Sequence, residues 1–105
     1  MDLSPKHLSI LERLVAARIG PITLPMYPNA VCVYRDNFVA ALVPSASGGF
    51  SLLGEPGYLI DNKLAVAIER EGKKHFVFKQ KSIPITPDLE AKFQSFRADL
   101  SNALS

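Results

Sequence analysis

The chain has 105 residues, the usual size of one domain, and 48% are hydrophobic, so it can bury a core without disulfides or metals. This composition excludes a disordered chain, and a net charge of +2 is too small to indicate nucleic acid or an anionic membrane as partner. The one cysteine excludes an intramolecular disulfide and fits a reducing compartment. Without a signal-like start or an unbroken apolar run of about 18 residues, we expect a single cytoplasmic domain over residues 1–105 that does not span a membrane.

Local signals near the N-terminus predict a helix over residues 5–19. Ser4 is a good N-cap, and Pro5 suits the first helical position, where a missing N–H costs nothing. Gly20 and Pro21 are expected to end the helix. Its apolar stripe comprises Leu8, Leu11, Leu14, Val15 and Ile19.

A proline-rich segment and a hairpin follow. Three prolines limit residues 22–26 to an edge strand, because proline cannot donate to a sheet ladder. Residues 30–35 and 38–43 are predicted to pair around Asp36 and Asn37, which tolerate the positive φ of a tight turn.

After a Ser/Gly loop, a short strand is expected at residues 50–53. Residues 55–58 then have the Pro-Gly centre of a type II turn, with Gly57 at the position that needs a positive φ.

The clearest hairpin joins residues 64–70 to residues 73–81 through Glu71 and Gly72. This register places Glu69 opposite Lys74, so that unlike charges meet across the strands.

The C-terminal helix is predicted to start after Thr86, a good N-cap followed by proline and two acidic residues. Its apolar face comprises Leu89, Phe93, Phe96, Leu100 and Leu104.

Short connections favour antiparallel pairing of neighbouring strands. The sequence therefore predicts an α+β domain: a mostly antiparallel sheet of about five to six strands, flat or curved into a roll, flanked by an N-terminal and a C-terminal helix. The strands are apolar on both faces, whereas a half-exposed strand should alternate. The second face must be covered by sheet curvature, by a second copy of the chain or by a ligand.

Charge is scarce in the middle of the chain. Between Ile19 and Gly54 the only charged residues are Arg35 and Asp36, which predicts either burial within the monomer or an interface. For the interface alternative we expect a homodimer anchored by Tyr34 and Val39.

No residue pattern indicates catalysis or a cofactor. Cys32 lies between two valines and is expected to be a buried structural thiol, while His7 is expected to be solvated in a first helical turn. There is no metal-binding spacing and no nucleophile–base pair, so the sequence favours a protein without enzymatic activity, metal or cofactor.

Two segments are candidate binding sites. In the turn after residue 54, turn chemistry leaves the roles of Glu55, Tyr58 and Asp61 unexplained. The strand 73–81 interleaves aromatic residues with bases, a pattern that single-stranded nucleic acid binding also uses. Its candidate contacts are Lys74, Lys79 and Lys81, although lysines at a hairpin rim also prevent edge aggregation.

The sequence therefore favours a non-enzymatic protein-interaction module that self-associates. The alternative is a binder of a small apolar ligand held between a curved sheet and the C-terminal helix. A weaker alternative is single-stranded nucleic-acid binding through the basic hairpin at residues 73–81.

Overall fold

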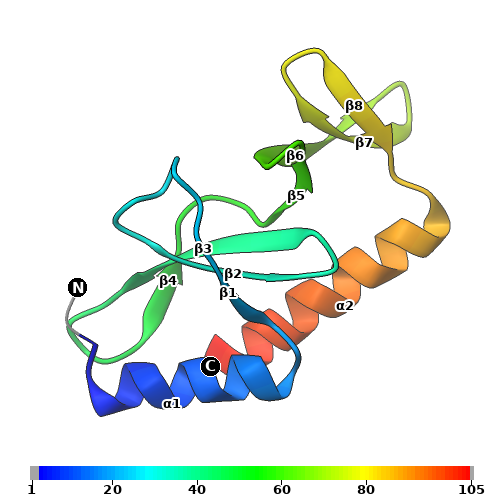
Figure 1. The fold of residues 1–105 in the computed structure, drawn as a ribbon. Helices are drawn as coiled ribbons and strands as arrows, with labels where there is room; N and C mark the ends of the chain where they lie inside the picture. Colours follow the sequence, from blue (N-terminus) through cyan, green and yellow to red (C-terminus); the bar gives the residue numbers. More distant parts are fainter. Residues whose placement is uncertain (1–2, 105) are drawn as a thin grey trace.

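The computed structural model describes residues 3–104 as an α+β fold, in which two helices flank a curled antiparallel sheet (Figure 1). The first helix, α1, spans Pro5–Ala16, and the last, α2, spans Pro87–Leu104. The strands between them are β1 (Gly20–Ile22), β2 (Val31–Arg35), β3 (Phe38–Pro44), β4 (Phe50–Leu52), β5 (Gly57–Ile60), β6 (Lys63–Arg70), β7 (Lys73–Phe78) and β8 (Lys81–Pro84). The predicted fold class is confirmed. Among the described residues, no helix is both long and apolar enough to cross a bilayer.

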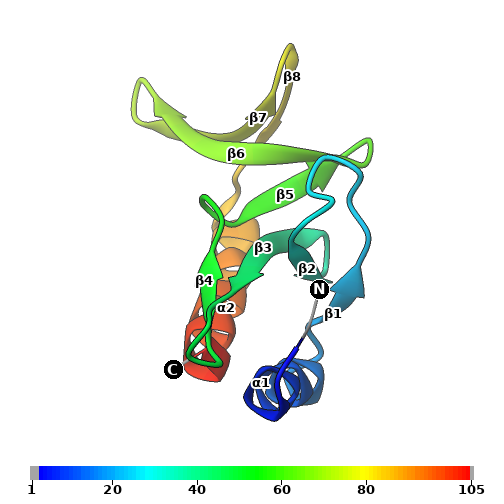
Figure 2. The ribbon, with the colours of Figure 1, turned by 90° about the vertical axis from the view of Figure 1, so that its left-hand side faces the viewer.

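The sheet runs in the order β1-β2-β3-β5-β6-β7-β8, and β4 pairs with β3 next to β5. Every pairing is antiparallel, and most join strands that are consecutive in sequence. The strands curl into a half-barrel, and β6–β8 extend away from α1 (Figure 2). The molecule is correspondingly elongated, with principal extents of 45 × 25 × 19 Å.

Both predicted hairpins form in the expected register. Arg35 pairs with Phe38 across Asp36 and Asn37, whose φ angles are 53° and 70°. Glu69 pairs with Lys74 across the second turn.

The strand count is higher than expected, partly because the predicted strand 73–81 is divided. Lys79 adopts a φ of 55°, and the chain turns there into the separate strand β8.

Helix α1 ends earlier than predicted, at Ala16 instead of residue 19. Arg18 takes a left-handed conformation with φ of 66°, and the Ile19 N–H donates to the Leu14 carbonyl at 2.8 Å. This bond and the one from the Arg18 N–H to the Val15 carbonyl close a Schellman motif.

The buried face of α1 also differs from the predicted stripe. Leu8 and Val15 are exposed, at 49% and 59%, whereas His7, Ile10 and Leu14 are buried. The capping box rotates His7 inward: its backbone N–H donates to the Ser4 hydroxyl, and its ring accepts from the Ser4 N–H.

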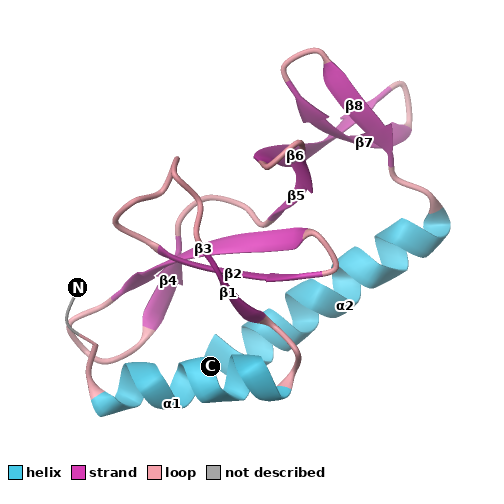
Figure 3. Ribbon diagram, in the orientation of Figure 1, coloured by secondary structure: helices cyan, strands magenta, loops and turns pink. Residues whose placement is uncertain are grey.

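The main core lies between the sheet and the helices, as Figure 3 shows for the strands β1–β4 above α1 and α2. Its centre is an aromatic cluster in which the Phe38 ring lies 5.4 Å from Phe93, 5.9 Å from Phe96 and 6.3 Å from Phe76. Tyr58 stacks on Phe76 at 5.1 Å. These rings fill space between the curled sheet and α2, where the sequence suggested a small apolar ligand.

A second, smaller core covers the opposite face of the sheet. Residues 22–30, here called the strap, cross this face and bury Cys32, Val39 and Ala41 beneath Leu24. Tyr27 packs at the margin of this cluster. The sequence predicted that this face would be covered by sheet curvature, by a second copy of the chain or by a ligand. In the structure, the strap covers the centre of the face.

Candidate functional site

The predicted binding loop does not assemble as one site. Tyr58 is part of the aromatic core, against Phe38 and Phe76. Asp61 forms an ion pair with Lys81 at the far end of the sheet. Glu55 instead lines a groove against α2. Gly57 does not adopt a positive φ but begins β5, so the expected type II turn is absent.

The three basic candidates make separate interactions. The Lys74 ammonium pairs with Glu90 at 3.2 Å, and hydrogen bonds from Gln94 and Lys74 hold the pKa of the Glu90 carboxyl below its ordinary value. Lys79 lies over the Phe78 ring at 5.4 Å, and Lys81 pairs with Asp61. Lys74 lies at the opposite end of β7 from the other two, so the three do not form one basic groove.

The two predicted interface anchors have different environments. Tyr34 is 39% exposed on β2 and is accessible to a partner. Val39 is fully buried under the strap. The sequence predicted that a second chain would cover this residue, but the strap of the same chain does so. Val39 is therefore not at the surface in this structure.

Cys32 and His7 are both engaged in the interior. Burial raises the pKa of the Cys32 thiol. A hydrogen bond with the Leu24 backbone acts in the opposite direction, but its effect is smaller. His7, expected in solvent, is buried. Because its Nδ1 accepts from the Ser4 N–H, its Nε2 carries the proton and donates to the Ser45 carbonyl at 3.0 Å. Within residues 3–104, no three His, Cys, Asp or Glu side chains are grouped so that they could hold a metal ion.

Among the described strands, three have a hydrogen-bonded neighbour on one side only: β1, β4 and β8. An open edge can recruit another strand, and natural proteins block such edges with lysine or proline. β1 contains Pro21, and β8 contains Lys81 and Pro84. β4 contains neither residue type, and the sequence carries no charge from residue 37 to residue 54.

The backbone of β4 alternates between its partner and the open edge. The Leu53 N–H donates to the Ala41 carbonyl of β3 at 2.8 Å, and Ser51 lies opposite Val43. Since polar backbone groups of successive residues point to opposite sides, Phe50 and Leu52 direct theirs outward.

Apolar side chains surround this edge. Val43, Leu52 and Leu53 are exposed at 38%, 45% and 44%. Val43 and Leu53 lie on the strap side of the sheet, and Leu52 lines the groove against α2. We refer to β4 with these side chains as the β4 edge. Its only sequence signal was the uncharged stretch.

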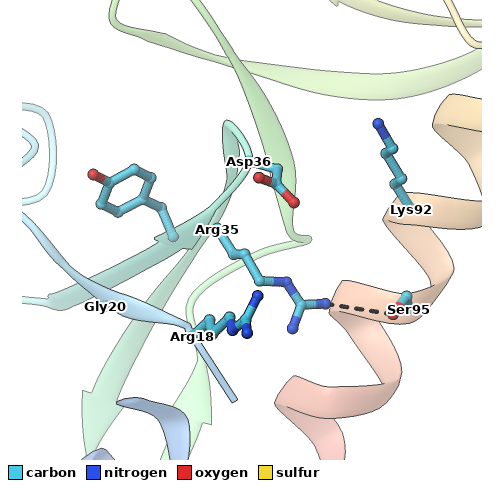
Figure 4. Close-up of a pocket in the computed structure, with 7 residues that line it drawn as sticks. Arg18, Gly20, Arg35, Asp36, Lys92 and Ser95 are labelled. Atoms are coloured by element: carbon cyan, nitrogen blue, oxygen red, sulfur yellow. Dashed lines mark hydrogen bonds between the residues drawn. The ribbon is translucent and has the colours of Figure 1, made fainter. Parts of the chain in front are cut away.

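A second surface feature was not predicted. Arg35 extends from β2 to the helices: its Nη1 donates to the Ala17 carbonyl at 2.8 Å and to Asp99 at 2.7 Å. It lines a pocket of about 580 Å³ together with Arg18 and Lys92 (Figure 4). These residues come from distant parts of the chain, so no local motif could reveal the pocket.

Comparison with known proteins finds no match to this chain among family models, curated proteins or solved structures.

Proposed function

We propose that this protein is a non-enzymatic interaction module that self-associates by pairing the β4 edge of one copy with that of a second. The observation that carries the proposal is the contrast among the three open edges: two contain lysine or proline, and β4 contains neither. The buried Cys32 thiol and the engaged His7 ring support a binding role rather than nucleophilic chemistry. An unpaired thiol also supports a reducing, cytoplasmic setting.

Antiparallel pairing of two identical strands suits a two-fold axis, the commonest symmetry of homodimers. With the axis at Ser51, the outward groups of Phe50 in one copy face those of Leu52 in the other and exchange hydrogen bonds. The small Ser51 side chains then face each other, and Val43 and Leu53 of both copies extend the contact with apolar surface. No charge between residues 37 and 54 opposes this approach.

Sedimentation equilibrium at micromolar concentration tests the proposal. The native protein should show twice the chain mass of 11.5 kDa. Leu52→Pro removes an outward N–H while leaving the bonds between β4 and β3 intact, so it should yield the monomer. Leu52→Ala removes the same side chain but keeps the N–H, and it should retain more dimer than the proline variant.

A second variant tests the same axis without altering the backbone. Ser51→Lys sets two like charges opposite each other in the dimer but leaves each exposed in the monomer. Ser82→Lys, an exposed serine on the lysine-bearing edge β8, carries the same charge change and should remain dimeric. A native protein that sediments as a single chain, or equal dissociation by both lysine variants, would refute pairing through β4.

A further inference from the structure

The pocket beside Arg35 gathers positive charge from three separate elements. Arg18 comes from the turn after α1 and Arg35 from β2, whereas Lys92 comes from α2 with its ammonium pointing away from the two guanidinium groups; Ser95 on α2 adds a hydroxyl (Figure 4). Of the described residues that line it, Asp36 is the one acidic residue. Asp99 neutralises Arg35 by direct contact. Within residues 3–104 the Arg18 and Lys92 side chains have no hydrogen-bonding or ion-pair partner, which leaves an excess of positive charge facing the pocket.

Arg35 is held in place before any ligand arrives. Its guanidinium is fixed by the Ala17 carbonyl and Asp99, lies 3.5 Å from the Ser95 hydroxyl, and sits over the Phe96 ring at 5.9 Å. Its side chain is only 18% exposed. A rigid, partly buried cation binds an anion without a further ordering cost.

Arg18 occupies a position where glycine is the usual residue. It is the residue after the C-cap in the Schellman motif, with φ of 66°, a conformation that costs energy for most residues with a side chain, arginine included. The fold bears that strain at a position that directs a guanidinium into the pocket. The pocket also has open space at its wall, because a Cβ built on Gly20 would meet nothing within 4 Å.

We propose that this pocket binds a small organic molecule that carries a phosphate group. A phosphate monoester carries between one and two negative charges at neutral pH and three acceptor oxygens, which suit the guanidinium groups of Arg18 and Arg35, while Lys92 adds positive charge at the wall of the pocket. A single carboxylate has one charge and two oxygens, and it matches this set less well. The volume of about 580 Å³ leaves room for an organic group beyond the phosphate.

Calorimetric titration with pyrophosphate and with glycerol phosphate, at constant ionic strength, tests this site in the native protein. Both should bind, and acetate, a single carboxylate, should bind more weakly than either. No heat above that of a sodium chloride blank with either phosphate compound would overturn the proposal. Tighter binding of acetate would overturn the phosphate assignment.

Arg18→Gly is the decisive variant, because it should weaken binding while stabilising the fold. The substitution removes one charged contact, which should weaken pyrophosphate binding by about tenfold or more. It also relieves the positive φ, so the midpoint of thermal unfolding without ligand should rise by a few degrees. Lost binding by this variant therefore cannot be attributed to unfolding.

Lys92→Gln should weaken binding similarly, whereas Lys73→Gln is the control of equal charge at the distant β6–β7 turn and should bind within about twofold of the native protein. Equal weakening by both lysine variants would mean that pyrophosphate responds to net charge alone, and it would overturn the site.

Discussion

Gly57 is a position at which the fold tolerates no side chain. A Cβ there would overlap with the Ala65 carbonyl oxygen on the neighbouring strand and lie 2.8 Å from the Leu64 Cδ1. The reason for this glycine is close contact between β5 and β6, whereas the sequence suggested a turn conformation.

Gly57→Ala should lower the free energy of unfolding by about 3 kcal/mol, because backbone cannot yield as a flexible side chain can. Urea denaturation measures the loss. Gly20→Ala is the matched control: a Cβ there meets nothing within 4 Å, so its effect should stay within about 0.5 kcal/mol. Equal losses in both variants would show that the contact with Ala65 is not the cause.

Cys32 should resist thiol reagents in the folded protein. The thiol is buried under the strap, and burial raises its pKa, so the reactive thiolate is both scarce and inaccessible. With a disulfide reagent at pH 8, labelling should be slow in buffer and fast in urea. Native protein that reacts as fast as a free cysteine peptide would mean that the strap does not cover Cys32.

The raised pKa of the Cys32 thiol makes the stability of the fold depend on pH. Because the pKa of this thiol is higher in the folded than in the unfolded chain, its stabilising contribution is complete below the unfolded pKa of about 8.5 and is lost as pH rises through the folded pKa. Native protein should therefore lose more stability than Cys32→Ala between pH 8 and pH 10. Parallel losses would contradict the assignment.

Among the elements, α2 contributes two phenylalanines to the main core. Phe93 and Phe96 are both buried, as the spacing along the helix predicted, and Phe96 is fully enclosed. Phe96→Ala should cost about 3–5 kcal/mol in urea denaturation, through lost burial and the cavity that remains. Ser101→Ala, on the exposed side of the same helix, should cost less than about 0.5 kcal/mol. A Phe96→Ala loss below about 1 kcal/mol would mean that α2 is not packed on the sheet.

Elements with strong local chemistry were predictable. Ser4 and Thr86 cap their helices, and the Asp-Asn pair at 36–37 turns the chain with positive φ. The end of α1 and the division at Lys79 were not predictable, because arginine and lysine carry no signal for the left-handed conformation they adopt there.

The candidate sites were less predictable than the elements. The uncharged stretch pointed to the region of β4, but not to the strand whose edge is open, since edge status depends on the order of all the strands. Val39 was predicted to lie at an interface. The sequence could not show that Leu24 covers it, because that contact depends on the path of the strap. The pocket beside Arg35 forms only because α2 packs against β2. These elements are far apart in the sequence, so no short segment could indicate the pocket.

At the scale of the whole molecule, the two proposed sites lie on different elements. The β4 edge lies in the uncharged part of the sheet, whereas the pocket beside Arg35 lies where α1, β2 and α2 meet. The two proposals involve different residues, so Ser51→Lys should leave pyrophosphate binding unchanged and Arg18→Gly should leave the dimer intact.

The order of the strands has a consequence for folding kinetics. Nearly every strand pairs with its neighbour in sequence, so sheet contacts close short loops, whereas the bond between Arg35 and Asp99 joins residues 64 positions apart. Short loops lower the entropic barrier, and we expect the β2–β3 hairpin to form before the transition state and α2 to dock after it. In stopped-flow chevrons, Val33→Ala should then mainly slow folding, and Phe96→Ala should mainly accelerate unfolding. The reverse pattern would mean that α2 docks first and that the sheet assembles on it.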